Sequence, residues 1–286
     1  MPAAATPTEV PQWAAFGRLS SMKLSLPREH GSWAVLIAPI IVGFAAAQGG
    51  PPPAMLLFSC AALGGFLLRP PLQAILFSKQ AEAGAWASLS LYCLLALGGL
   101  LPLIGMYGRI GLAGFAVPAA GLLALDLVVQ KGRRSFSIAS ELSGILILCL
   151  GAPAAYYAAR GTVNAEAWCA WLLSALYFTG PIFHVKMAAL QHRASVDSRL
   201  AGELTRMRTI SRLYSGAALG LAAAVAVWGQ APALATLPFA AALAKTWLRG
   251  AEPPGRVDFR KLGYQEVGYA VFFALILSAG YIMRRA

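Results

Sequence analysis

Nine stretches of mainly apolar residues alternate with short polar or turn-forming segments along the chain. Each stretch is close to the roughly 20 residues that an α-helix needs to cross a bilayer. The stretches lack the two-residue alternation of barrel strands, and a helix satisfies every backbone group inside lipid. The pattern therefore predicts an all-α, polytopic integral membrane protein with nine transmembrane helices, at residues 32–48, 54–77, 86–104, 110–129, 138–159, 167–185, 212–229, 231–248 and 264–283.

Basic residues are unevenly distributed among the segments that connect these stretches. Of the 23 Lys and Arg residues, 19 lie in alternate segments that would share one side of a membrane. Because basic loops are retained in the cytoplasm, this distribution predicts a bacterial cytoplasmic (inner) membrane protein with its N-terminus inside and its C-terminus outside. The opposite side would hold Arg109, Arg160, Arg284 and Arg285.

Composition supports a membrane location and limits the partners. With 58% hydrophobic and 12% charged residues, the chain is too apolar for an ordinary soluble domain. The net charge of +12 comes from cations in short loops and not from a continuous soluble face. We therefore expect an anionic membrane lipid or isoprenoid as partner, and no nucleic acid. We also expect a single transmembrane domain over residues 32–286, after an N-terminal cytoplasmic or interfacial segment over residues 1–31.

Ionisable residues near the cytoplasmic ends of the spans are the candidates for chemistry. Charges next to lipid are costly, so they usually pair, reach the headgroups or serve a function. Arg69 precedes Pro70 and Pro71, which interrupt the second span, and a guanidinium beside such a break can bind a phosphate with two hydrogen bonds. Reaching the lipid headgroups is the alternative role for Arg69. The predicted binding residues for an anionic head are Arg28, His30, Arg69, Lys79, Lys186, Arg193 and Arg199.

The segment after the sixth span has two interpretations. Arg193 and Asp197 are four residues apart, as are Arg199 and Glu203, so a helix would place each pair on one face. One interpretation is a solvated helical hairpin braced by weak surface pairs. In the other, Lys186 and the two arginines bind the anionic head, while the two acids orient them or hold a divalent cation.

Two further acids are predicted to support the cations, each with a structural alternative. Glu141 can stabilise a helix N-terminus, where negative charge is favoured. Asp126 can pair with Lys131 at the end of the same helix. The predicted supporting acids are thus Asp126, Glu141, Asp197 and Glu203.

Motifs for nucleotide, hydrolase and metal chemistry are not found in the sequence. The chain has no P-loop, no GxGxxG after a strand and no Ser-His-Asp spacing. His184 and His192 are too far apart on one helix, at about 12 Å, to hold one ion. No catalytic residue is predicted, and Mg²⁺ is the one cofactor left open.

A separate pattern concerns helix packing. Gly216 and Gly220 form a GxxxG that predicts close contact between helices.

The start of the first span carries a family resemblance. Together with Ala38-Pro39, it resembles the opening signature of the YwiC-like family of bacterial membrane proteins, a family without an established activity. The resemblance is specific over about 20 residues, which include the sequence Leu26-Pro27-Arg28-Glu29-His30-Gly31-Ser32-Trp33-Ala34.

More distantly, the layout resembles the UbiA superfamily of intramembrane prenyltransferases, which have nine helices and a cytoplasm-facing cavity. Residues 140–157 are similar to the fifth-helix region of its quinone-synthesis members, and residues 197–205 to the tail of their second aspartate-rich motif. The resemblance implies a UbiA-like bundle and an isoprenoid ligand. Those enzymes hold a diphosphate through Mg²⁺ bound by clustered acids in two loops. Residues 69–80 of this chain contain no acid, so the first motif is missing and a two-site Mg²⁺ clamp is not expected.

These observations lead to three hypotheses of function. The leading one is a YwiC-like protein that binds an isoprenoid or other anionic lipid at its cytoplasmic face, as a diverged UbiA-like transferase if it is an enzyme. The second is a transporter or efflux carrier, ranked lower because the outer halves of the spans contain few ionisable residues. The third is a membrane assembly factor without catalytic activity.

Overall fold

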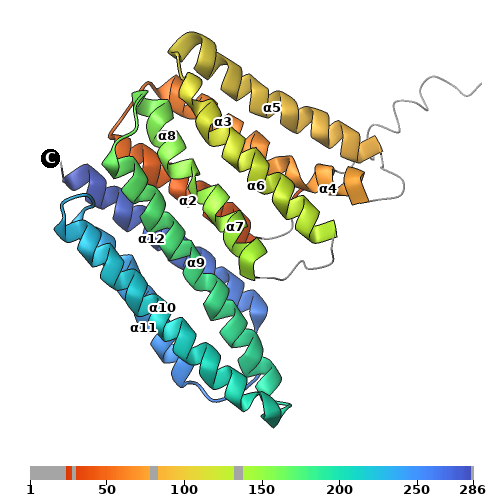
Figure 1. The fold of residues 1–286 in the computed structure, drawn as a ribbon, viewed down its shortest axis with the longest axis vertical. Helices are drawn as coiled ribbons and strands as arrows, with labels where there is room; N and C mark the ends of the chain where they lie inside the picture. The colour runs from red at the N-terminus through yellow and green to blue at the C-terminus, as the bar shows by residue number, and fades with distance from the viewer. Residues whose placement is uncertain (1–23, 28–29, 78–82, 132–137, 285–286) are drawn as a thin grey trace, which may run out of the picture.

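The computed structural model describes residues 24–27, 30–77, 83–131 and 138–284. These residues form helices and connecting turns, with no β-strand among them, which confirms the predicted all-α class (Figure 1). The first part of the chain forms α2 (His30–Ala47), α3 (Pro52–Leu67), α4 (Arg69–Phe77), α5 (Ala83–Tyr107), the 3₁₀ turn η1 (Ile110–Leu112), α6 (Ala113–Lys131), α7 (Ile138–Cys149) and α8 (Gly151–Arg160). The second part forms α9 (Ala165–Ala194), the 3₁₀ turn η2 (Ser198–Leu200), α10 (Ala201–Val227), the 3₁₀ turn η3 (Ala233–Ala235), α11 (Thr236–Ala251) and α12 (Phe259–Met283).

Two of the predicted spans are each divided into two helices. The second span is interrupted at Leu68, just before Pro70 and Pro71 in the first turn of α4. Backbone hydrogen bonds continue across the interruption, since Leu68 N donates to Gly64 O at 3.2 Å and Leu72 N to Leu68 O at 3.1 Å. The fifth span is divided in the same way at Leu150, between α7 and α8.

Six helices in the described part of the chain are long and apolar enough to cross a membrane. Two shorter apolar helices run over Gly31–Ala47 and Ile110–Leu125. Helix α11 has 16 residues, about 24 Å of helix, which is less than the hydrocarbon thickness of about 30 Å. A helical membrane protein is thus confirmed, whereas length and composition support six spans and not the predicted nine. The six are Pro52–Phe77, Ala83–Tyr107, Glu141–Arg160, Ala165–Ala194, Ser198–Val227 and Phe259–Met283.

The segment predicted as a loop after the sixth span is largely helical. Helix α9 continues to Ala194, and α10 begins at Ala201 after the short turn η2. The two helices form a hairpin whose tip lies at the bottom of Figure 1. The helical part of the hairpin interpretation is therefore confirmed over most of this segment.

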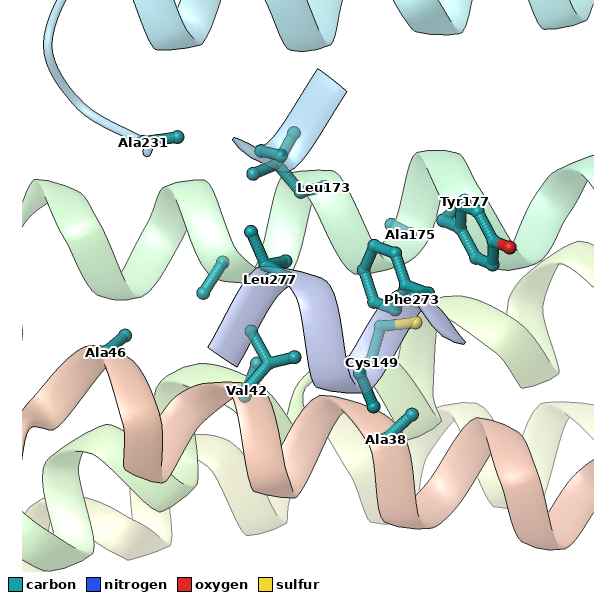
Figure 2. Close-up of a cluster of buried hydrophobic side chains, with 14 of the residues drawn as sticks. Ala38, Val42, Ala46, Cys149, Leu173, Ala175, Tyr177, Ala231, Phe273 and Leu277 are labelled. Atoms are coloured by element: carbon teal, nitrogen blue, oxygen red, sulfur yellow. The ribbon is translucent and has the colours of Figure 1, made fainter. Parts of the chain in front are cut away.

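The main hydrophobic core lies where α2, α9 and α12 meet, with contributions from α7, α8, α10 and η3 (Figure 2). Its centre is aromatic: Tyr177 of α9 stacks on Phe273 of α12 with ring centroids 4.2 Å apart, and Phe239 of α11 packs edge-on against Tyr177 at 5.5 Å. The Tyr177 hydroxyl donates to the Tyr269 carbonyl at 2.9 Å. Apolar burial alone does not hold helices together in lipid, so this close packing and hydrogen bonding fix the arrangement.

Close helix contacts occur at glycines other than the predicted pair. A Cβ atom on Gly43 of α2 would overlap the Ala152 carbonyl of α8, and one on Gly64 or Gly99 would overlap the backbone across the α3–α5 contact. A Cβ atom on Gly216 or Gly220 would meet nothing within 4 Å. The prediction of close packing at that GxxxG is therefore wrong within this chain, because both of its glycines lie on the exposed side of α10.

The described arginines of the predicted outer side bind the C-terminal ends of helices. Arg109 donates to the carbonyls of Ala158 and Ala159 at 3.1 and 3.3 Å, at the end of α8. Arg160 donates to the Ala47 carbonyl at the end of α2, and Arg284 to the Gly229 carbonyl just after α10. A cation is favoured at a helix C-terminus because the last carbonyls lack helical partners. These arginines thus join helix ends at the face opposite the hairpin tip.

Candidate functional site

The predicted binding residues do not form one cluster. Arg28 and Lys79 lie outside the described residues. His30 is the first residue of α2 and Asp126 lies in α6, but the side chains of both are outside the described part. Arg69 begins α4, which Figure 1 places well away from the tip of the α9–α10 hairpin.

Lys186 and Glu141 form an ion pair between two helices. The Lys186 ammonium of α9 lies 3.1 Å from Glu141 Oε1 in the first turn of α7. Their side chains are 26% and 33% exposed, so solvent screens the pair and its contribution to stability is small. Glu141 therefore links α7 to α9 and occupies the helix N-terminus that its sequence position indicated.

Four charged residues of the predicted site are exposed at or near the tip of the α9–α10 hairpin: Arg193, Asp197, Arg199 and Glu203. Asp197 caps η2, because its Oδ1 accepts from Arg199 N at 3.0 Å. Helix α9 ends at Ala194 and the backbone at Asp197 is extended, so the helical pairing predicted for Arg193 and Asp197 is wrong. Within the part of the chain that the structure describes, no group of three or more His, Cys, Asp or Glu residues could hold a metal ion.

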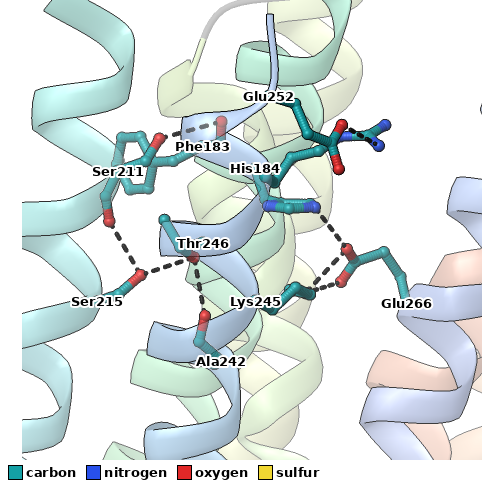
Figure 3. Close-up of polar contacts among 10 residues, drawn as sticks. Phe183, His184, Ser211, Ser215, Ala242, Lys245, Thr246, Glu252 and Glu266 are labelled. Carbon is teal, nitrogen blue, oxygen red and sulfur yellow. Dashed lines mark hydrogen bonds and ion pairs between the residues drawn. The ribbon is translucent and has the colours of Figure 1, made fainter. Parts of the chain in front are cut away.

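A different set of charges is buried between α9, α11 and α12 (Figure 3). The Lys245 ammonium of α11 donates to both carboxylate oxygens of Glu266 of α12, at 2.9 and 2.8 Å. His184 of α9 is 4% exposed, and its Nε2 lies 3.7 Å from Glu266 Oε1. The Lys245 and Glu266 side chains are only 14% and 13% exposed, so each depends on the other for compensation of its charge.

Further contacts hold Lys245 at this position. Its Nζ lies 4.5 Å from the centroid of the Tyr269 ring, a cation–π contact on the same helix as Glu266. One turn of α11 is tied to α10, because Thr246 Oγ1 and Ser215 Oγ are 3.2 Å apart. Ser215 Oγ also donates to Ser211 O at 2.9 Å, so these buried hydroxyls are satisfied within the bundle.

The end of α11 next to this site is held by polar side chains of α9 and α10. Gln191 of α9 is 2% exposed and donates to the Arg249 carbonyl at 2.8 Å. Arg208 of α10 donates to the Glu252 carbonyl. Arg249 itself pairs with the Glu252 carboxylate at 3.0 Å, while its buried Nε has no hydrogen-bond partner among the described residues. The C-terminal turn of α11 is thus fixed in place, with the guanidinium groups of Arg208 and Arg249 each incompletely bonded among the described residues.

Two cavities adjoin the buried ion pair. The first, here called the inner cavity, has a volume of about 150 Å³ and lies inside the bundle among α2, α9, α11 and α12. Its lining is mostly apolar, with Val35, Tyr177, Phe178 and Ala270 among the lining residues, and it includes Glu266. It also includes Gly31, which follows His30 in the segment that carries the family resemblance.

The second cavity, here called the groove, has a volume of about 640 Å³ and lies between α11 and α12. Lys245, Arg249, Leu248 and Phe272 are among its lining residues. Leu248 is 73% exposed, so the groove opens on the outer surface of the bundle. His184 and Lys245 line both cavities, which therefore meet at the buried ion pair.

The sequence did not predict this site, although its members lie at the edges of predicted spans. Lys245 lies near the end of the predicted span 231–248 and Glu266 near the start of the predicted span 264–283, while His184 was considered only as a metal ligand with His192. The signal that could have singled them out is depth, because Lys245 lies six residues before the end of α11 and Glu266 seven residues after the start of α12. Charges this far inside adjacent helices are expected to pair.

Comparisons with known proteins agree with the resemblance in the sequence. A family model described as YwiC-like protein matches residues 26–156. The "Uncharacterized protein YwiC" of Bacillus subtilis (strain 168) is 25% identical over 169 residues, which are 58% of this chain and 67% of that protein. No solved structure matches the chain significantly. The family match ends at Tyr156, so His184, Lys245 and Glu266 lie beyond it.

Proposed function

We propose that this chain, which matches the YwiC-like family model over residues 26–156, binds an amphiphile with an anionic head at its cytoplasmic side. The proposed position is the groove between α11 and α12. The head contacts Lys245 and Arg249, and the tail lies against Leu248 and Phe272. Phosphate esters of isoprenoids and of acyl chains both fit this description.

The observation that carries the proposal is the pairing of cations with exposed apolar side chains in one groove. Arg249 has a buried Nε without a partner among the described residues, and its side chain as a whole is 22% exposed. Its carboxylate partner Glu252 is 54% exposed, so an incoming phosphate can displace that carboxylate at small cost. A guanidinium binds phosphate through two parallel hydrogen bonds, which makes Arg249 the main contact for the head.

Ligand binding is tested by thermal unfolding of the purified protein in a neutral detergent, without Mg²⁺. Farnesyl diphosphate and lauroyl lysophosphatidate are the two anionic probes, and farnesol is the uncharged control. A probe at about 100 times its dissociation constant stabilises the folded protein by about 2.7 kcal/mol. We expect stabilisation by the anionic probes only, and Arg249→Gln should weaken their binding about tenfold or more, because it removes a charge-assisted contact.

Two further variants locate the site. Arg206→Gln removes an exposed cation from the same end of α10 and should leave binding unchanged. Arg69→Ala tests the helix break that the sequence indicated. Loss of binding in Arg69→Ala but not in Arg249→Gln would place the head at α4 and overturn the groove as its site. Equal stabilisation by farnesol would show that the anionic head is not recognised.

We also propose that the groove lies at the cytoplasmic side of the inner membrane, with the N-terminus inside and the C-terminus outside. The proposal is supported by the basic residues around the ends of α9 and α11, whereas Arg109, Arg160 and Arg284 at the opposite face serve helix ends. A cysteine at the exposed Ser198 should be protected from an impermeant maleimide in intact cells, and one at the exposed Gln230 should react. Labelling of Ser198→Cys in intact cells would reverse the orientation.

A further inference from the structure

The inner cavity has the size and lining of a binding chamber. Its volume of about 150 Å³ equals that of protein cavities that bind a single benzene ring. Two aromatic side chains, Tyr177 and Phe178, and several aliphatic ones line it. This mostly apolar lining favours an uncharged group, because the charges of Lys245 and Glu266 in it already compensate each other and a further charge would lose its hydration.

The position of the ion pair suggests how the chamber is reached. Lys245 belongs to the lining of both cavities, and Glu266 to that of the inner cavity. The two side chains join α11 to α12 between the chamber and the groove, and the groove opens toward exposed apolar side chains such as Leu248. Separation of the ammonium from the carboxylate would therefore connect the chamber with the bilayer.

The pair is also suited to reversible separation. Lys245 has a second contact in the face of the Tyr269 ring, 4.5 Å from its ammonium, and Glu266 has a second neighbour in His184 at 3.7 Å. Each charged group therefore keeps a polar or aromatic neighbour when the direct contact is broken, which offsets part of the cost of separation. This arrangement differs from a purely structural pair, in which separation leaves both charges without any partner.

We propose that the inner cavity is a binding chamber for an uncharged apolar group of about the size of one benzene ring, entered from the bilayer between α11 and α12, and that the Lys245–Glu266 pair closes this entrance. The chamber is separate from the groove, and its test does not depend on binding of an anionic head there.

The test measures access to a cysteine inside the chamber. In a background in which the four native cysteines are alanine, Ala242→Cys places a thiol in the lining of the inner cavity. Leu248→Cys, six residues further along α11, places one in the groove as a matched control. N-phenylmaleimide, an uncharged reagent in which one benzene ring is attached to the reactive maleimide ring, should label the cysteine at 248 rapidly and the one at 242 slowly.

Opening the entrance and filling the chamber should then change labelling at position 242 alone. Glu266→Gln removes the charge that holds Lys245, and should raise the labelling rate at 242 about tenfold. Toluene at about twice its dissociation constant should lower that rate about threefold by occupying the chamber. Neither change should affect labelling at 248.

Two controls separate entry from unfolding and from another route. A cysteine at Ala222, which is fully buried on α10, should stay unlabelled in the Glu266→Gln background; its labelling would mean that the variant unfolds. If Glu266→Gln unfolds the protein, Lys245→Met is used in its place, because it removes the other charge of the pair. Rapid labelling at 242 with the pair intact would show that the pair does not close the chamber. Absence of protection by toluene would overturn the chamber as a binding site.

Discussion

Replacing Glu266 with glutamine is expected to destabilise the protein by about 3 kcal/mol, because it leaves the ammonium of Lys245 without its carboxylate at a site where that side chain is 14% exposed. Removal of one partner from a buried ion pair typically costs 3–5 kcal/mol, since the remaining charge is desolvated and uncompensated. The cost falls at the lower end here because Lys245 retains its contact with Tyr269. Reversible unfolding in mixed micelles, followed by circular dichroism, measures the change.

The double variant Lys245→Met with Glu266→Gln is the decisive comparison. It removes both charges and keeps side chains of similar size, so it should recover most of the lost stability. The exposed pair of Arg249 and Glu252 supplies a matched control, and Glu252→Gln should cost less than about 1 kcal/mol. A double variant as unstable as Glu266→Gln would show that the hydrogen bonds of the carboxylate, and not its charge, hold α11 and α12 together.

Replacing Gly43 with alanine is expected to destabilise the protein by about 3 kcal/mol. A Cβ atom at this position would overlap the carbonyl group of Ala152, so α2 and α8 must move apart. Overpacking of this kind forces shifts of the backbone, because no flexible side chain is available to yield. Unfolding in mixed micelles again gives the magnitude, and the α2–α8 contact should loosen before the rest of the bundle.

Gly216 provides the matched control for that substitution. Its Cβ would meet nothing within 4 Å, so Gly216→Ala should be neutral or stabilising by up to about 1 kcal/mol, as expected for alanine in place of glycine inside a helix. Substantial loss of stability in Gly216→Ala would contradict the open environment of this position. It would also indicate that the GxxxG face of α10 is covered in the membrane by another helix.

The sequence predicted the positions of the helices better than their detail. Apolar runs located every helix from α2 to α12, because the bilayer requires long uninterrupted apolar segments whatever their partners are. The end of α9 was missed by nine residues, since charged residues such as Lys186 and Arg193 looked like loop but lie on a helix that extends beyond the apolar region. The hydropathy of a segment indicates whether lipid or water surrounds it, but it does not indicate where the helix ends.

In the candidate site, the sequence likewise predicted single residues better than the contacts between them. Charge near a helix end marked Glu141 and Arg69 as candidates, and the structure gives Glu141 a partner in Lys186. Lys245 and Glu266 were not among the predicted site residues. Their association depends on the positions of α11 and α12 relative to each other, which residue spacing within either helix does not encode.

The sequence by itself therefore determined that this is a membrane protein, that it is helical, and that it resembles the YwiC-like family over residues 26–156. These properties follow from composition and local order, because lipid demands internal hydrogen bonding and a family signature is a linear pattern. The tertiary structure decided which charges are buried together, which glycines permit close contact and where the cavities lie. Such properties depend on side chains from helices distant in the sequence, as with His184, Lys245 and Glu266, and only packing brings these residues together.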